Sequence, residues 1–92
     1  MYFQVRVRVD LSKMAEFVKK LQKNELDRSC IRGDTFCLKN DPAVGFSIWE
    51  AYSRQEFETK FDPWRNYYNE VEIHEVIPPL DAMVSLLDKV NT

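Results

Sequence analysis

Two arginines on one predicted strand are the side chains that most need a chemical partner. Residues 2–9 alternate strictly between apolar and polar types, which indicates a strand with one face against a core. The face opposite that core carries Tyr2, Gln4, Arg6 and Arg8. A guanidinium group in a sheltered position needs a carboxylate or a ligand. Arg6 and Arg8 therefore mark a candidate site that binds an anionic or polar group.

Carboxylates and the only histidine of the chain could join this site. Ion pairs of the arginines with Glu50, Glu70 or Glu72 are the simpler interpretation, and a ligand-binding cavity is the alternative. His74 and Glu50 are the candidate catalytic residues. A strand histidine is usually a hydrogen-bonded structural residue, and Glu50 could act as a general base only with a raised pKa in a cavity wall. Glu72 beside His74 could form a relay or an ion pair.

Aromatic side chains form the second candidate group. They recur at helical spacing around residues 57–68, a pattern typical of a core but also of a pocket rim. Of these rings and the strand tryptophan, we take Trp49, Trp64 and Tyr68 as ligand-binding candidates. The chain has no Ser-His-Asp set, phosphate-binding loop or acidic metal cluster, so we assign no metal site and no cofactor.

The length and charge of the chain restrict the class of protein. Ninety-two residues are enough for one domain, which we expect to span residues 1–92. The formal net charge of −2, with both signs mixed, argues against a nucleic-acid partner and against binding to an anionic membrane. The chain has neither a signal-peptide pattern nor an apolar run long enough to cross a membrane. We therefore expect a cytoplasmic protein.

The two cysteines have no metal-binding spacing. A disulfide between Cys30 and Cys37 is conceivable if Gly33 and Asp34 form a two-residue hairpin turn that places the cysteines opposite each other. In a reducing cytosol, two free thiols are the more common state. We expect free thiols.

The remaining patterns predict the secondary structure. Helix signals follow the first strand from Asp10 or Ser12 to about Asn24, and again from Ser53, with an expected break and restart at Asp62–Pro63. Extended segments are predicted at residues 35–38, 44–52 and 70–77, and a short amphipathic helix at residues 80–90. The order is β-α-β-β-α-β plus a C-terminal helix, a ferredoxin-like α+β fold.

In this topology the first and third strands lie at the centre of a four-stranded antiparallel sheet, and two helices cover one face. The other face stays open unless a partner covers it. The third strand could present either Ser47 and Trp49, or Phe46, Ile48 and Glu50, to that open face. Both sets contain large apolar groups, so the hydrophobic pattern leaves the choice open.

Residues 49–61, with the sequence WEAYSRQEFETKF, resemble the central strand and helix of the dimeric α+β barrel superfamily. The likeness is greatest to antibiotic-biosynthesis-monooxygenase-like and small uncharacterised members, whose turn and strand end are also similar to residues 41–45 and 75–78. The resemblance implies a homodimer formed through the open sheet faces and a small-molecule cavity between sheet and helices. Some members are cofactor-free oxygenases of aromatic substrates, and some bind haem.

One departure from the family pattern argues against an enzyme: residues 61–64 lack the histidine that often follows the central helix in monooxygenase-like members. Our leading hypothesis is a homodimeric binding or interaction domain for a small polar or aromatic ligand. The alternative is a cofactor-independent monooxygenase-like or haem-binding enzyme, and a third possibility is a structural assembly partner. A closed cavity joining His74 or Glu50 to Trp49 and Trp64 would favour the enzyme.

Overall fold

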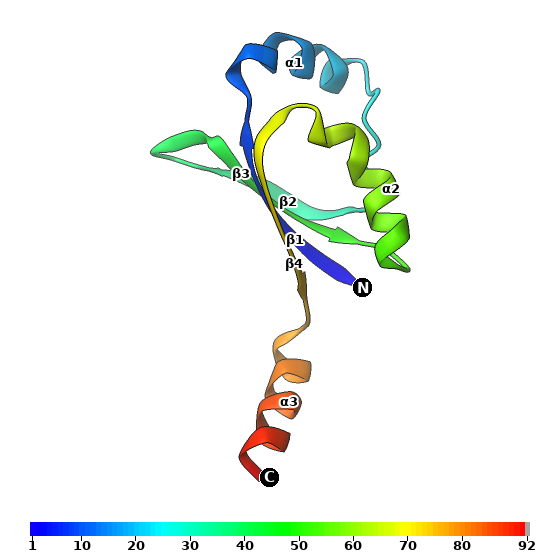
Figure 1. The fold of residues 1–92 in the computed structure, drawn as a ribbon, viewed down its shortest axis with the longest axis vertical. Coiled ribbons are helices and arrows are strands. Elements are labelled where there is room, and N and C mark those ends of the chain that lie inside the picture. The colour runs from blue at the N-terminus through cyan, green and yellow to red at the C-terminus, as the bar shows by residue number, and fades with distance from the viewer. Residues whose placement is uncertain (92) are drawn as a thin grey trace.

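The computed structural model describes residues 1–91, so the predicted domain of residues 1–92 ends at a residue outside the described part. The elements follow the predicted order (Figure 1). They are β1 (Tyr2–Val9), α1 (Met14–Gln22, after a 3-10 turn at Leu11–Lys13), β2 (Ile31–Leu38), β3 (Asp41–Glu50), α2 (Arg54–Arg65), β4 (Tyr68–Val76) and α3 (Pro79–Asn91).

The four strands form one antiparallel sheet in the order β2-β3-β1-β4, with β1 and β3 at the centre as predicted. The register pairs Phe3 with Trp49, Val5 with Ser47 and Val7 with Gly45. Because paired residues share a face, β3 presents its odd-numbered side chains to the core. Phe46, Ile48 and Glu50 therefore face the open side, which decides the choice that the sequence left open.

The core lies between the sheet and the helices α1 and α2, and aromatic rings dominate it. Phe57 of α2 stacks on Phe3 of β1 with ring centroids 4.4 Å apart, and both side chains are 0% exposed. Trp49 meets Phe61 and Trp64 edge to face, at 5.4 and 5.8 Å. Such contacts add to the free energy gained by burying the rings. The helices cover one sheet face only, as predicted.

The two helix starts have the expected caps, but the predicted break in α2 is wrong. The Asp10 carboxylate accepts a hydrogen bond from the Ser12 backbone N–H at 3.0 Å, and the Ser53 hydroxyl accepts one from the Glu56 N–H at 3.1 Å. The helix α2 continues through Pro63 to Arg65. Pro63 removes one backbone hydrogen bond, but a break there would withdraw buried Trp64 from the core.

The chain around Gly33 and Asp34 does not form the two-residue hairpin turn that the sequence left open. Gly33 has a φ of 70° and lies inside β2, where the pairing with β3 shifts register between Arg32 and Phe36. A glycine tolerates this left-handed backbone, so the strand bulges instead of turning back. The hairpin that would have placed the two cysteines opposite each other does not form. Cys30 is buried, Cys37 is exposed, and both are free thiols.

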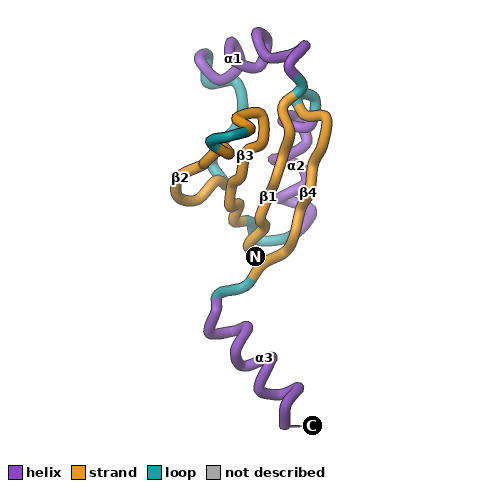
Figure 2. Tube along the Cα trace, turned by 90° about the vertical axis from the view of Figure 1, so that its left-hand side faces the viewer, coloured by secondary structure: helices purple, strands orange, loops and turns teal. Residues whose placement is uncertain are grey.

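The helix α3 extends away from the rest of the molecule, and Figure 2 shows it continuing beyond the end of β4. It buries none of its side chains, and it contributes to the long dimension of 53 Å. Within residues 1–91, no helix has the length and apolar character needed to cross a membrane.

The stacked aromatic core predicts a large effect of removing one ring. Replacing Phe57 with alanine should lower the free energy of unfolding by about 3–5 kcal/mol, because the substitution leaves a cavity between Phe3 and Phe61. Tyr52→Ala is the control, since Tyr52 is 94% exposed and should change stability by less than about 0.5 kcal/mol. Urea unfolding followed by circular dichroism measures both. A Phe57→Ala loss below about 1 kcal/mol would contradict the described packing.

Candidate functional site

A cavity of about 620 Å³ opens between the sheet and the helices, and we call it the sheet–helix cavity. Its size depends on small side chains at two core-facing positions of β3, Gly45 and Ser47. A Cβ built at Gly45 would lie 3.6 Å from the Cys37 sulfur and 3.7 Å from a Val7 methyl, which are ordinary contact distances. The backbone therefore accepts a side chain there, and the glycine leaves that volume empty.

Aromatic rings make up much of the cavity wall. Trp49 lies on the β3 side, and Phe61 and Trp64 reach it from α2. Tyr68 lies at the start of β4, with its ring stacked on Phe61 at 6.2 Å. Flat apolar walls of this kind suit a flat apolar ring.

Two hydroxyl groups supply hydrogen bonding inside this apolar wall. Burial raises the pKa of Tyr68, with a smaller contribution from the Cys37 thiol, so the phenol stays protonated. Within residues 1–91 the Tyr68 hydroxyl makes no hydrogen bond. The Ser47 hydroxyl accepts a bond from Trp49 Nε1 at 2.9 Å and keeps its own hydrogen to donate. Both groups can therefore bind a polar atom on a ligand.

Arg28 is an exposed residue at the outer edge of the cavity wall. The preceding residue, Asp27, connects this part of the chain to α2. The Asp27 carboxylate accepts hydrogen bonds from Lys60 Nζ at 2.7 Å and from the Ser29 N–H at 2.8 Å. Its backbone carbonyl accepts a third from Trp64 Nε1 at 3.2 Å. The Lys60 bond, followed by those of Ser29, holds the pKa of Asp27 well below its usual range. These bonds fix one side of the cavity relative to α2.

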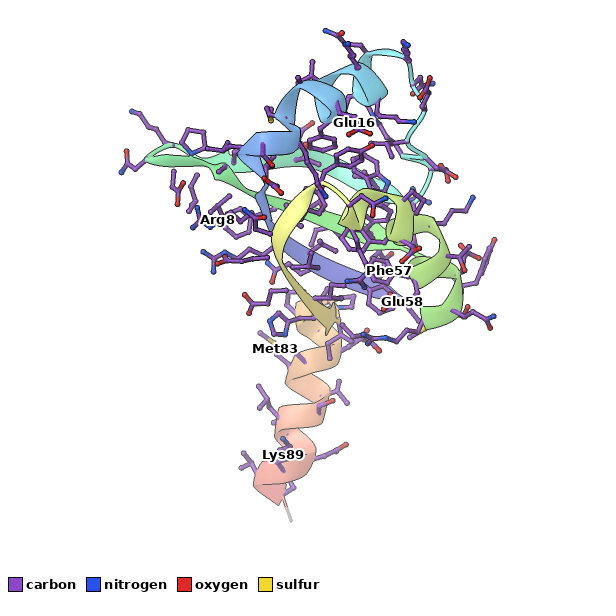
Figure 3. The ribbon with its side chains drawn as sticks, turned by 45° about the horizontal axis from the view of Figure 1, so that its top comes forward. Arg8, Glu16, Phe57, Glu58, Met83 and Lys89 are labelled. Atoms are coloured by element: carbon purple, nitrogen blue, oxygen red, sulfur yellow. The ribbon has the colours of Figure 1, made fainter. Side chains whose placement is uncertain are left out.

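On the other face of the sheet, the arginines of β1 form the predicted kind of ion pair. Arg6 meets Glu72 at 3.8 Å, and Arg8 meets Glu70 at 3.3 Å. Arg8 also pairs at 3.0 Å with Asp41, a partner that the sequence analysis missed. Figure 3 shows Arg8 on one side of the sheet and Phe57, a residue of α2, on the other. The pairs are partly exposed, so each contributes modest stability.

The two candidate catalytic residues lie on this same open face and are held by neighbours. Glu50 accepts a hydrogen bond from Arg32 Nε at 2.9 Å, and this bond lowers the Glu50 pKa. A general base in a cavity wall would need the opposite shift. His74 Nε2 lies 2.8 Å from the Glu72 carboxylate, and this hydrogen bond lowers the Glu72 pKa. The arrangement is that of an exposed ion-pair network.

The predicted site residues therefore form two groups on opposite faces of the sheet. The sheet–helix cavity brings together Trp49, Trp64 and Tyr68. The open face carries Arg6, Arg8, Glu50, Glu72 and His74. Sequence reasoning missed Gly45 as a space-leaving residue and Asp27 as a brace. Small residues at 45 and 47, alternating with large ones on a central strand, were the available signal for the space.

Comparisons with known proteins identify solved structures of similar fold. The 5-chloro-2-hydroxyhydroquinone dehydrochlorinase (TftG) of Burkholderia phenoliruptrix AC1100, solved with 2,5-dihydroxybenzoquinone, is similar at 14% identity and a TM-score of 0.54, over 84% of this chain and 94% of that one. Protein Atu4242 from Agrobacterium tumefaciens is similar at 15% identity and 0.50, over 85% and 93%. An antibiotic biosynthesis monooxygenase gives 12% identity and 0.48, over 84% and 98%. No family model and no curated protein matches the chain.

At these identities the comparison shows a shared fold. The chain has the ferredoxin-like α+β fold that these proteins share, as the predicted order of elements implied. The similar region leaves out part of this chain, since the matches cover 84% and 85% of it. The chemistry of the cavity has to be argued from its own residues.

The Asp27 brace predicts a defined pH dependence of stability. Because the folded pKa of Asp27 lies below the unfolded value of about 3.9, the carboxylate stabilises the fold fully at neutral pH and loses this effect as the pH falls below about 4. Asp27→Asn removes the titrating group. The stability difference between wild type and Asp27→Asn should therefore be larger at pH 7 than at pH 3, measured by urea unfolding.

Asp62→Asn on the exposed side of α2 is the matched control, because within residues 1–91 the Asp62 side chain forms no ion pair or hydrogen bond. An Asp27→Asn difference that does not change with pH would show that the carboxylate has no stabilising contact with Lys60.

Proposed function

We propose that this protein is a small homodimeric binding protein that holds a small aromatic ligand in the sheet–helix cavity. One observation carries the proposal: the space left by Gly45 and Ser47 is lined in part by aromatic residues, among them Tyr68, whose hydroxyl has no hydrogen-bond partner within residues 1–91. A purely structural core would fill this space, since protein interiors are close-packed.

The cavity has the size and composition of a small-molecule site. Its volume of about 620 Å³ falls within the range of about 300–1,000 Å³ usual for such sites, which are mostly apolar with a few placed polar groups. A ring can lie against the partly exposed lining residues Val7 and Leu21 while an oxygen on the ring meets the hydroxyl of Tyr68 or Ser47. The favoured ligand is therefore an aromatic ring that bears a hydroxyl or carbonyl group.

The dehydrochlorinase with this fold was solved with 2,5-dihydroxybenzoquinone, a ring with oxygen substituents. For this chain, that complex supports the choice of phenolic compounds as the first probes. The argument for the ligand class remains the lining of its own cavity.

The placement of the titratable groups supports binding over catalysis. His74 and Glu50 project from the sheet face opposite the cavity, so neither meets a ligand in the cavity. His74 also does not fit as an axial ligand for a haem in the cavity, because the sheet lies between them. The oxygenase and haem-binding alternatives therefore cannot use either of the two predicted catalytic residues at the place where the substrate would lie.

The open sheet face supports the proposed homodimer. It carries partly exposed charged pairs beside the apolar side chains of Phe46 and Ile48, and helices cover only the other face. A second copy would cover this face and shelter the arginine pairs from water. A cytoplasmic location, where Cys30 and Cys37 would stay reduced, remains part of the proposal.

Filling the space at Gly45 should weaken ligand binding without loss of the fold. Wild type should bind 1-naphthol in isothermal titration calorimetry and should not bind cyclohexanol, which lacks an aromatic ring. Gly45→Val should weaken binding of 1-naphthol at least about tenfold, or about 1.4 kcal/mol, because its methyl groups occupy the cavity. Gly45→Ala, the matched control for the backbone change, should have a smaller effect.

A second variant tests the hydrogen bond. Tyr68→Phe should weaken 1-naphthol binding by about 0.5–1.5 kcal/mol, the usual contribution of one neutral hydrogen bond. Thermal melting must show that all three variants stay folded. Failure of wild type to bind 1-naphthol or hydroquinone, or equal binding by Gly45→Val, would overturn the proposed site.

A further inference from the structure

The helix α3 presents apolar side chains that no other part of residues 1–91 covers. Leu80, Met83, Val84 and Leu87 recur at helical spacing and form one side of the helix, which we call the α3 stripe. Leu80 is 76% exposed, and the other three are 58–60% exposed. An exposed patch of this kind marks an interaction site.

The link between β4 and α3 prevents the stripe from folding back onto its own sheet. Only Ile77 and Pro78 separate the end of β4 at Val76 from the start of α3 at Pro79. Two successive prolines fix their own φ angles and hold the preceding residues in extended conformations. A helix that reversed over the sheet would need a sharp turn at this point. The stiff link directs α3 away from the body, as Figure 1 shows.

A second apolar surface lies on the open sheet face. Phe36 of β2 is paired with Phe46 of β3, and Ile48 lies two residues further along the same face, so the three side chains form what we call the β2–β3 patch. Phe36 is 68% exposed. The charged pairs of Arg6 and Arg8 occupy the other half of the face, towards β4. The patch therefore has an apolar centre and a charged border.

We propose that the α3 stripe of each copy packs on the β2–β3 patch of a second copy, so that the two chains exchange their C-terminal helices. This inference rests on the proposed homodimer and adds the segment that joins it. A helix of 13 residues is about 20 Å long and 10 Å wide. One helix and one patch give a footprint of about 400 Å² per copy, and the remaining contact between the open sheet faces supplies the rest of a standard interface of about 800 Å² per copy.

The charges next to both surfaces favour a second copy of this chain as the partner. Asp81 and Asp88 lie together along one flank of the α3 stripe, and Arg6, half exposed, borders the patch with its guanidinium carbon 5.9 Å from the Phe46 ring centroid. Acidic groups on the helix thus meet a cation beside the patch. A membrane surface is a poorer partner, because α3 carries two aspartates and only Lys89 as a basic residue.

Single charge substitutions in the full chain test both surfaces. Native mass spectrometry and sedimentation velocity should show wild type as a dimer at micromolar concentration. Leu87→Lys on the stripe and Ile48→Lys on the patch should each raise the dimer dissociation constant at least about tenfold, since each buries an unpaired charge. Ser85→Lys, on the opposite side of α3, is the matched control and should leave the constant unchanged.

Mixing the two damaged chains gives the sharper test. A homodimer of either variant has two defective contacts, whereas a mixed dimer keeps one intact contact, between the helix of the Ile48→Lys chain and the patch of the Leu87→Lys chain. The mixed dimer should therefore form in preference to both homodimers. This recovery is specific to a helix that packs on the patch of the other copy.

Each other outcome overturns the exchange. Loss of the dimer with Leu87→Lys alone would indicate pairing between the two α3 helices, and loss with Ile48→Lys alone would indicate pairing of the sheets without α3. A wild type that stays monomeric would remove the dimer, and its sedimentation with phosphatidylcholine vesicles would make α3 a membrane-binding helix. Neither Ile48 nor Leu87 lines the sheet–helix cavity, so binding of 1-naphthol by these variants separates these failures from failure of the proposed ligand site.

Discussion

A sheet covered by helices on one face must satisfy two different environments with the same strands. In β1, Phe3 and Val5 are buried against the helices, whereas Arg6 and Arg8 project the other way. Strict alternation makes this possible, because a shift of one residue would bury the guanidinium groups and expose the rings. The register that pairs Phe3 with Trp49 therefore determines the core, the cavity and the charged face together.

The arginines stabilise the open face through their hydrocarbon stems as well as through their charges. Val44 lies opposite Arg8 in the register on the open face, yet it is 1% exposed. Long arginine side chains can cover an apolar neighbour while keeping the charge in water. The carboxylates of Asp41, Glu70 and Glu72 then hold the guanidinium groups in place. The sheet can expose this half of its face with little apolar surface in contact with water.

The sequence predicted the element order and the central strands because hydrophobic alternation and caps are local signals. It could not give the orientation of β3, since Phe46 and Ile48 on one face balance Trp49 on the other, and only the pairing with β1 decides. For this reason the sequence left open whether Trp49 shares a face with Arg6, whereas the sheet separates them in the structure. Pro63 and Gly33 suggested ends of elements that the structure does not have, for a related reason. Burial of Trp64 and pairing of β2 with β3 outweigh the local tendency of proline and glycine to interrupt a helix or strand.

The peripheral position of α3 also affects how the chain unfolds. None of its side chains belongs to the aromatic core, and it follows all four strands in the chain. The sheet and its two covering helices can therefore stay compact while α3 alone loses its helical structure. Such local unfolding has a smaller free-energy cost than unfolding of the whole domain, because it breaks no contact among the buried rings.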